Sequence, residues 1–264
     1  MDTIQAVIIA IVEGLTEFIP ISSTGHMIIA SKLLQVPDNN FTKVFQVAIQ
    51  LGAILAVVVL YWKKFFDFKN WQFYLKLMVG IIPAIILGLL FGDKIDELLE
   101  STTTVAIALL AGGVVLLFVD NFFKHPTIET EKEVSFKKSF IIGLWQCLAM
   151  VPGMSRSAAS IIGGMQQKLT RGAAAEFSFF LAVPTMLAAT GYKLLKHYKI
   201  EGGFSGEEIK LLAIGNLVAF IVALIAIKFF ISFLKKYGFR VWGIYRIIVG
   251  IILLYMIYSG HVAP

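Results

Sequence analysis

Apolar segments alternate with short polar ones along the whole chain, and the apolar segments fall into two length classes. A helix needs about 20 apolar residues to cross a bilayer. Six segments reach that length, whereas four shorter ones form two pairs, each interrupted by a proline. We therefore expect an all-α fold of six spanning helices and two pairs of short helices. The expected spans are residues 42–62, 73–92, 103–123, 172–195, 209–235 and 240–259, and the short helices are 4–19, 22–35, 139–150 and 153–166.

Helix-breaking residues separate the two members of each short pair. Pro20 precedes Ser22 in the first pair, and Pro152-Gly153 interrupts the second. Non-helical backbone at membrane depth is tolerated only where protein or a water-filled cavity surrounds it. Each pair therefore predicts a re-entrant hairpin, which enters and leaves the membrane on the same face. Pro83 lies within a full-length span, where a kink is expected.

The composition indicates a polytopic membrane protein. The chain is 58% hydrophobic and 15% charged, with a mean hydropathy of +0.83, whereas soluble domains are about 45–50% apolar and about 25% charged. Its net charge of +6 is explained by loop residues that orient the protein in the bilayer. No basic and aromatic surface is expected outside the spans, so nucleic acid is not an expected partner. A single cysteine, Cys147, rules out a disulfide within the chain.

The two halves of the chain follow the same plan, in which a short-helix hairpin is followed by three spans. Residues 14–23 resemble residues 143–155 in their order of glycine, proline and serine. An odd number of spans per half requires the second half to be inverted relative to the first, an arrangement that recurs in membrane proteins with broken helices. We expect a single membrane domain, 1–264, made of a first repeat at 1–123, a connector at 124–135 and a second repeat at 136–264.

The loop charges predict how this topology is oriented. Seven Lys and Arg residues fall on the side of the two termini, and fourteen fall on the opposite side. Cytoplasmic loops carry the excess of Lys and Arg. We therefore expect both termini outside the cytoplasm, with the first hairpin entering the membrane from that outer side.

Two carboxylates lie in the first short helix. Glu13 and Glu17 are four residues apart and share one helix face. Two carboxylates at this spacing repel each other in a low dielectric, so that either one is protonated or a cation lies between them. A divalent cation, Mg²⁺ or Ca²⁺, would fit this pair because both ions prefer oxygen ligands. The alternative is a solvated pair without a metal.

Hydroxyl side chains gather where the second helix of each hairpin begins. Helix N-termini bind anions, phosphate in particular, through free backbone N–H groups. Arg156 adds a fixed charge with two parallel donors, a geometry that suits phosphate. Helix capping is the alternative role for the serines, and contact with the membrane interface is the alternative for Arg156. The candidate phosphate-binding residues are Ser22, Thr24, Ser155, Arg156, Ser157 and Ser160.

Ser23 and His26 are candidates for the chemistry itself. They are three residues apart on one face of the second short helix. Ser23 is a potential nucleophile, and His26 could act as an acid or base or orient that nucleophile. The alternative for His26 is a packing residue. Glu176 and Arg246 are also ionisable and lie within predicted spans, so we expect them to pair with each other or to support the site.

Together, these residues predict a phosphoryl-transfer site inside a membrane domain. A divalent cation held by Glu13 and Glu17, with an arginine, would neutralise the charge that develops on phosphate; the alternative for Glu17 is to serve as a base. A site at membrane depth implies a substrate whose phosphate is attached to a lipid tail. A lipid transporter is the rival class, because inverted repeats with broken helices suit alternating access. A structural scaffold would leave these residues unexplained.

Three motifs resemble the undecaprenyl-diphosphate phosphatase family, which is also known as the BacA/UppP or bacitracin resistance family. The motifs are Glu13-Gly-Leu-Thr-Glu17, Pro20-Ile-Ser-Ser-Thr-Gly-His26 and Pro152-Gly-Met-Ser-Arg-Ser-Ala-Ala-Ser160. The resemblance extends over essentially the whole chain. Ser160 stands where the family usually has threonine, a departure that keeps the hydroxyl group.

This resemblance implies a reaction and a place in the cell. The expected reaction converts undecaprenyl diphosphate to the monophosphate carrier lipid, which is reused for peptidoglycan synthesis. Bacitracin acts on the lipid substrate rather than on the protein, so more enzyme would relieve the antibiotic. The resemblance also implies a multi-pass protein of the bacterial plasma membrane whose site opens to the outer face. The implied site comprises Glu13, Glu17, Ser23, His26, Ser155 and Arg156 with a divalent cation, and attack by Ser23 or by water are both open.

Overall fold

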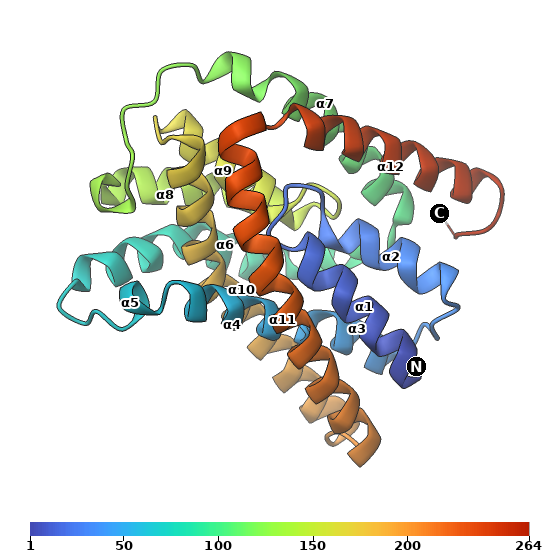
Figure 1. Cartoon of the computed structure of the whole chain (residues 1–264). Coiled ribbons are helices and arrows are strands. Elements are labelled where there is room, and N and C mark those ends of the chain that lie inside the picture. The colour runs from blue at the N-terminus through green and yellow to red at the C-terminus, as the bar shows by residue number, and fades with distance from the viewer. Residues whose placement is uncertain (264) are drawn as a thin grey trace.

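The computed structural model describes residues 1–263, without the side chains of residues 93, 96, 97, 99 and 100. The described part of the chain consists of helices joined by short loops (Figure 1). Its helices are α1 (Thr3–Thr16), α2 (Ser23–Leu33), α3 (Asn40–Ala48), α4 (Gln50–Leu60), α5 (Trp62–Phe65), α6 (Trp71–Glu100), α7 (Thr102–Phe122), η1 (Glu131–Glu133), α8 (Phe136–Gln146), η2 (Cys147–Met150), α9 (Arg156–Gln166), α10 (Arg171–Glu201), α11 (Gly206–Tyr237) and α12 (Arg240–Tyr258).

The predicted spans are confirmed. Six segments of the described chain are long and apolar enough to cross a membrane, and each overlaps one of the predicted spans. The first segment is made of α3 and α4 together, and the fourth, α10, continues past the predicted end at residue 195. The six segments are Asn40–Leu60, Trp71–Gly92, Thr102–Phe122, Arg171–Glu201, Gly206–Tyr237 and Arg240–Tyr258.

Two of these spans depart from regular helix. The first span is interrupted at Ile49 between α3 and α4, and in the first turn of α4 the Gly52 N–H donates to Asn216 Oδ1 of α11 at 2.8 Å. A Cβ at Gly52 would collide with the Asn216 backbone, so this glycine permits the close approach of α4 to α11. In α6, the residue with non-helical dihedrals is Phe91. The interruption of α6 therefore lies further along the helix than Pro83, where the sequence predicted a kink.

Both predicted hairpins are present. A turn at residues 17–22 joins α1 to α2, and α8 leads through η2 to a turn at residues 151–155 before α9. The four α-helices have 14, 11, 11 and 11 residues. At about 1.5 Å per residue, they are too short for a hydrocarbon core of about 30 Å. Because α1 ends at Thr16 rather than at the predicted residue 19, Glu17 lies at the beginning of the turn.

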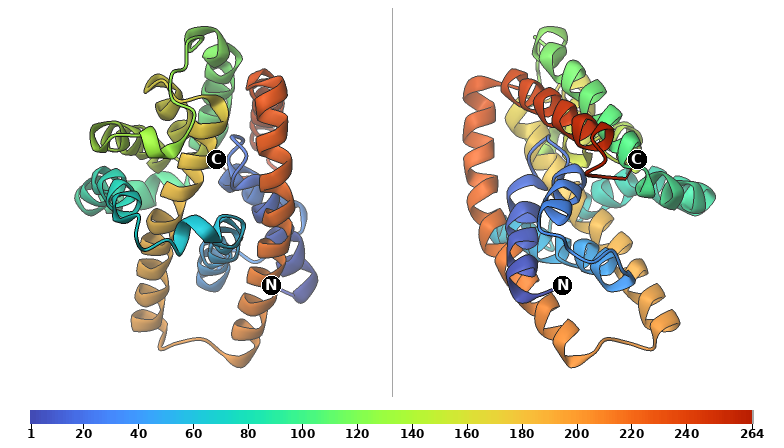
Figure 2. Two further views of the ribbon diagram at one scale, coloured as in Figure 1. Left: turned by 60° about the vertical axis from the view of Figure 1, so that its left-hand side comes forward. Right: turned by 90° about the vertical axis from the view of Figure 1, so that its right-hand side faces the viewer.

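Corresponding helices of the two halves make corresponding contacts. α1 packs along α11, α8 packs along α6, and α7 packs along α12 (Figures 1 and 2). The contact between α8 and α6 is so close that a Cβ at Gly143 would collide with the Gly80 carbonyl. The two halves therefore share their order of helices and their packing, while the repeat boundaries and the inversion of one repeat relative to the other stay predictions.

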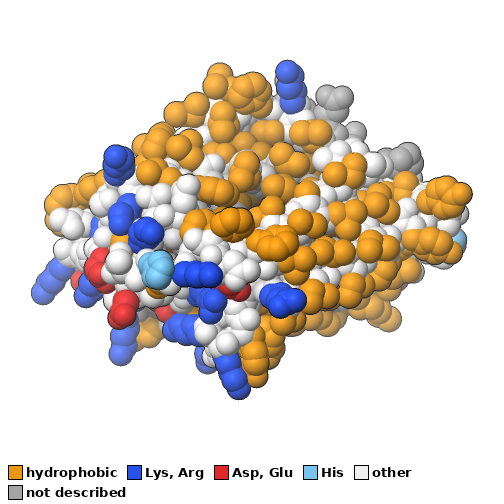
Figure 3. Space-filling model, turned by 90° about the horizontal axis from the view of Figure 1, so that it is seen from above, with side chains coloured by type: hydrophobic (Ala, Val, Ile, Leu, Met, Phe, Trp, Pro, Cys, Tyr) orange, Lys and Arg blue, Asp and Glu red, His pale blue; other side chains and the backbone are white. Residues whose placement is uncertain are grey.

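The surface of the protein is suited to lipid. Hydrophobic side chains cover most of the face seen in Figure 3, and charged side chains gather toward one edge. Along the spans, large apolar residues point outward, as Leu89 does with 82% exposure and Ile225 with 66%. An apolar surface of this extent marks a region that membrane or protein covers. The chain is therefore a multi-pass membrane protein. Both termini lie on the right of Figure 1, away from α5 and the connector on the left.

Candidate active site

Glu17 lies at the centre of a group of side chains that both hairpins contribute. Ser23, the first residue of α2, donates its hydroxyl proton to Glu17 Oε2 at 2.7 Å. Arg156, the first residue of α9, donates to Glu17 Oε1 from Nη2 at 3.0 Å and from Nε at 3.4 Å. The two polar stretches that the sequence singled out therefore meet at one carboxylate, which is nearly buried.

Arg156 is held by more than this carboxylate. Its Nη1 donates to the Ser178 carbonyl of α10 at 3.2 Å. Its guanidinium lies 5.8 Å from the centre of the Phe18 ring, within the range of a cation–π contact. The Arg156 side chain is only 11% exposed, so it does not extend to a membrane interface. An anion at this place would meet a fixed and permanently charged donor.

Glu13 is fully buried in α1, one helical turn before Glu17. Its carboxyl group interacts with the Glu17 carboxyl group and with Arg156, and no described residue other than Glu17 is placed to bond its oxygens. Two buried carboxylates this close are costly, and either a proton on Glu13 or a bound cation would offset that cost.

The chemistry of this pair fits a small divalent cation. Within the described part of the chain, no three His, Cys, Asp or Glu side chains form a metal-binding group. The protein would therefore contribute two carboxylates at most, Glu13 and Glu17. Mg²⁺ is commonly held by one or two carboxylates together with phosphate oxygens and water, and this pair satisfies that requirement.

Ser22 and Ser155 occupy equivalent places in the two hairpins. Each is the N-cap of the second helix, and its side chain accepts from a backbone N–H, from Gly25 at 3.4 Å and from Ala158 at 3.2 Å. Both have a positive φ, 69° and 68°, which residues other than glycine rarely adopt. Such strained positions cluster at functional sites. The capping role is therefore real for both serines, and the remaining N–H groups of the first turns, where Thr24 also lies, are free to bind an anion.

Ser157 and Ser160 correct the sequence-based prediction of phosphate binding. Both are fully buried. The Ser157 hydroxyl donates to the Phe18 carbonyl at 2.7 Å, which ties α9 to the first hairpin. The Ser160 hydroxyl donates to the Arg156 carbonyl at 2.7 Å and shares a 2.6 Å hydrogen bond with Ser178 Oγ. Because protein partners occupy these hydroxyls, the structure places them behind Arg156 as supports.

His26 has partners that the sequence did not reveal. Its Nδ1 lies 2.7 Å from the Ser22 carbonyl, and its Nε2 lies 2.8 Å from the Tyr245 hydroxyl of α12. A carbonyl can only accept, so Nδ1 carries the proton, and in the neutral ring Nε2 accepts from Tyr245. No hydrogen bond joins His26 to Ser23 among the described contacts, so the ring does not orient that hydroxyl directly. Tyr245 was missed because a tyrosine in an apolar span carries no sequence signal of its own.

Arg246 and Glu176 do not form the pair that the sequence left open. Glu176 Oε2 lies 3.9 Å from Lys64 Nζ. Arg246, fully buried in α12, donates to backbone carbonyls and to no side chain within the described part of the chain; the carbonyls include those of Pro20 and Gly153 in the two hairpin turns. The alternative expectation, that Arg246 supports the site, agrees with these contacts.

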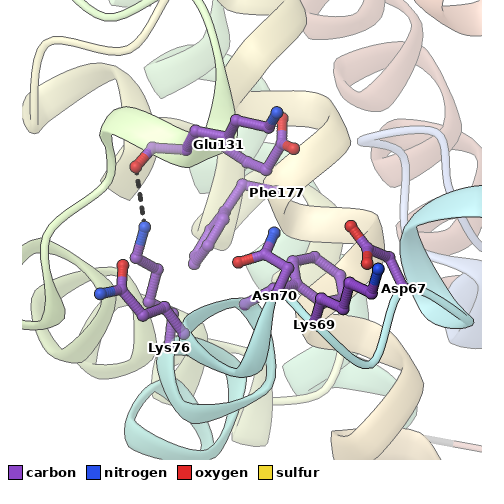
Figure 4. A pocket seen from close by; sticks show the side chains of 9 residues that line it. Asp67, Lys69, Asn70, Lys76, Glu131 and Phe177 are labelled. Carbon is purple, nitrogen blue, oxygen red and sulfur yellow. Dashed lines mark hydrogen bonds between the residues drawn. The ribbon is translucent and has the colours of Figure 1, made fainter.

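Two surface cavities lie away from the Glu17 group. One of about 390 Å³ lies beside the start of α6, and Figure 4 shows Asn70, Lys76 and Glu131 around it. There, Lys76 Nζ donates to a connector carbonyl at 2.8 Å, and Glu131 pairs with Lys64 at 2.7 Å. The other, of about 540 Å³, lies at the loop between α10 and α11. Neither cavity is lined by a residue of the Glu17 group.

The sequence of this chain matches a known protein family. The sequence model of a family described as bacitracin resistance protein BacA matches residues 6–252. This range contains both hairpins except the first three residues of α1, and all six spans except the end of α12. The chain belongs to the BacA family. The match confirms the resemblance that the hairpin motifs indicated.

Curated members of the BacA family are similar to this chain over nearly their full length. An undecaprenyl-diphosphatase of Flavobacterium johnsoniae is 57% identical over 262 residues, which cover 99% of this chain and 98% of the relative. An undecaprenyl-diphosphatase of Bdellovibrio bacteriovorus is 50% identical over 263 residues, with the same coverage. One from Clostridioides difficile, named undecaprenyl-diphosphatase 1, is 42% identical over 265 residues and 96% of each chain.

Proposed function

We propose that this protein is an integral membrane phosphatase that hydrolyses undecaprenyl diphosphate to undecaprenyl phosphate and inorganic phosphate. The observation that carries the proposal is the Ser23–Glu17–Arg156 group, which joins a hydroxyl, a carboxylate and a guanidinium from two hairpins. Relatives at 50% identity and above are named for this activity. No contact in the described structure favours the rival function of lipid transport.

Substrate binding begins with the diphosphate between the starts of α2 and α9, while the prenyl tail lies among the apolar spans. Arg156 and the free N–H groups of the two helix N-termini bind phosphate oxygens. In the structure, Arg156 Nη2 donates to Glu17 Oε1 at 3.0 Å. The guanidinium must therefore turn partly from Glu17 to the phosphate when the substrate binds. A divalent cation held by Glu13 and Glu17, Mg²⁺ or Ca²⁺, would neutralise phosphate charge when bound.

Ser23 is the nucleophile that the geometry favours. Its hydroxyl already donates to Glu17 Oε2 at 2.7 Å, the arrangement of a nucleophile with its base. Ser23 Oγ attacks the terminal phosphorus and passes its proton to Glu17, while the bond from that phosphorus to the bridging oxygen breaks. Undecaprenyl phosphate leaves, and water then hydrolyses the phosphoserine to restore Ser23. Direct attack by a water that Ser23 and Glu17 orient is the alternative.

The remaining residues control protons and charge. His26 presents Nε2 as its only acceptor in the neutral ring, because Nδ1–H is bound to the Ser22 carbonyl. Because Tyr245 donates to Nε2 in the structure, His26 takes up a proton there through the Tyr245 hydroxyl and returns it along the same path to a leaving oxygen or water. Arg156 neutralises the charge that builds on the transferred phosphoryl group, the usual largest electrostatic contribution in this class of reaction.

The proposed place of the reaction rests on the loop charges and on the family. The excess of Lys and Arg opposite the termini favours an orientation with both termini toward the outer face. The BacA family implies the bacterial plasma membrane and a site that opens to that face. There it would recycle the carrier lipid for peptidoglycan synthesis. It would also confer bacitracin resistance by removing the diphosphate on which the antibiotic acts.

The test is phosphate release from undecaprenyl diphosphate by the purified protein in detergent, with and without EDTA, beside Glu17→Gln. We expect release that requires a divalent cation and that Glu17→Gln lowers by a factor of about 10² to 10⁴, the range of general acid–base catalysis. Phosphate release that EDTA does not lower would support the phosphatase activity and reject the role of a divalent cation. No release from folded protein would contradict the proposal and favour a lipid transporter, which flipping in vesicles would reveal.

A further inference from the structure

Arg246 connects the two hairpin turns through the backbone. Its Nη1 donates to the Pro20 carbonyl at 3.3 Å and to the Met154 carbonyl at 3.0 Å. Its Nη2 donates to the Gly153 carbonyl at 2.8 Å. Pro20 lies in the turn between Glu17 and Ser23, and Met154 lies two residues before Arg156. A single guanidinium therefore bonds to the segments that carry both parts of the candidate site.

The same side chain is anchored to α7. Nη2 donates to the Ala108 carbonyl at 2.9 Å, and Nε donates to the Leu109 carbonyl at 3.3 Å. Gly112 makes room for the guanidinium, because a Cβ there would collide with it. Glycine inside a helix costs about 1 kcal/mol relative to alanine. The Arg246 side chain passes from α12 across α7 to the two turns, and this path requires the space that Gly112 leaves.

No acidic side chain of the described residues forms an ion pair with Arg246. The ion pairs of the described residues do not include Arg246, and all five of its hydrogen bonds end on neutral carbonyls. Burying a cation without an anion is expensive, and carbonyl dipoles offset only part of that cost. A residue that only joined the two turns would not need a charged group at this depth, whereas a site that binds a phosphate anion is stabilised by a positive charge nearby.

We propose that Arg246 is a positioning residue for the reaction, which holds the Glu17–Ser23 turn and the Arg156 turn in register around one phosphate. The inference rests on the proposed function. In the structure, Arg156–Glu17 also joins the hairpins. That contact weakens when Arg156 turns to the substrate, whereas the bonds of Arg246 go to backbone carbonyls and persist. Together with the Ser157–Phe18 hydrogen bond, Arg246 thus keeps the geometry at the moment when the Arg156–Glu17 link between the hairpins is given up.

The first test compares Arg246→Lys with Arg171→Lys. Lysine keeps the positive charge but lacks the planar guanidinium with its five donors. Its ammonium group therefore cannot bond to both turns and to α7 together. Arg171 is a matched control, since it donates to Asp120 at 2.7 Å at the start of α10 and contacts neither turn. We expect Arg246→Lys to lower kcat for phosphate release by about tenfold or more, the scale of hydrogen bonds to a charged group. KM should change less, and Arg171→Lys should keep both constants.

A second variant displaces Arg246 without changing it. Gly112→Ala places a methyl group against the guanidinium, whereas Gly191→Ala in α10 meets nothing within 4 Å and serves as its control. We expect Gly112→Ala to lower kcat in the same direction as Arg246→Lys, and Gly191→Ala to leave kcat unchanged.

A double-mutant cycle separates positioning from general stability. If Arg246 acts through the placement of Arg156, the kcat of Arg246→Lys with Arg156→Lys should lie well above the product of the single effects, because residues that act as a unit are not additive. Multiplicative losses, or normal kcat in folded Arg246→Lys, would overturn the proposal. Failure of both Arg246→Lys and Gly112→Ala to fold would make Arg246 purely structural and would overturn it as well. An inactive wild-type protein would instead reject the proposed function.

Discussion

Ser23 Oγ lies 2.7 Å from Glu17 Oε2, and this hydrogen bond folds the turn after α1 back onto the start of α2. The contact exists because α1 ends at Thr16, so that Glu17 and Ser23 lie at the two ends of one turn rather than along one helix. The base and the nucleophile candidates therefore come from the first hairpin. Arg156, whose guanidinium would bind the phosphate, comes from the second hairpin.

The role of Ser23 is tested by Ser23→Ala. If its oxygen attacks phosphorus, the variant should lose turnover by a factor of about 10³ or more, because a covalent route has no substitute nucleophile. Acid quench of the wild-type protein with labelled substrate should trap phosphoserine at this position. Ser232→Ala, which removes a hydroxyl bonded only within α11, is the control. Turnover of more than about a tenth of wild type in Ser23→Ala would assign the attack to water.

Glu13→Gln tests the cation site apart from catalysis. Glu13 has two buried oxygens without a donor, and a ligand that binds the folded state raises its stability. We expect Mg²⁺ or Ca²⁺ to raise the Tm of the wild-type protein and to raise that of Glu13→Gln much less, and EDTA to abolish the difference. Glu207→Gln, an exposed change on α11, should respond as the wild type does. Equal metal-induced shifts in Glu13→Gln and wild type would remove Glu13 as a ligand.

Tyr245→Phe tests the partner of His26. The tyrosine hydroxyl lies 2.8 Å from His26 Nε2, the atom that we expect to carry a proton during turnover. Loss of one such hydrogen bond costs about 0.5–1.5 kcal/mol, so kcat should fall about twofold to tenfold while KM stays close to wild type. The same change at Tyr255, which is 68% exposed on α12, provides the control. A rise in KM with unchanged kcat would place Tyr245 in substrate binding.

Ser160→Ala separates support from phosphate binding. The Ser160 hydroxyl bonds to the Arg156 carbonyl and to Ser178 Oγ, so its removal should destabilise the protein by about 1–3 kcal/mol through an unsatisfied buried group. Thermal unfolding in detergent measures this loss. Because the hydroxyl does not contact substrate, KM for the lipid should change little. A KM more than about tenfold higher, without loss of stability, would restore the phosphate-binding role.

The motif residues illustrate how far local sequence carries a prediction. Glu13, Glu17, Ser23 and Arg156 were chosen because polar residues are rare in apolar sequence, and the structure brings all four together. Ser157 and Ser160 were chosen by the same rule, yet their hydroxyls are bound to protein. Spacing along a helix places a residue on a face, but it does not say whether a carbonyl or a substrate lies opposite.

The contacts of Arg246 could not be predicted from the sequence. As an ionisable residue in a span, it was expected to pair with Glu176 or to support the site, and only the fold decides between these roles. Its partners are separated from it by 92 to 226 residues for the hairpin turns, and they are carbonyls, which every residue has. Acceptors of this kind leave no sequence signal.

The membrane class, the six spans, the two hairpins and the polar stretches can all be predicted from the amino-acid sequence, because hydrophobic length and helix breakers act locally along the chain. Three features depend on the folded structure: which hydroxyls face the site, the contact of Tyr245 with His26, and the bonds of Arg246 to both turns. Hydrogen bonds in a dry interior depend on which acceptors packing brings within about 3 Å. That packing is set by contacts such as Gly112 with Arg246, between segments far apart in the chain.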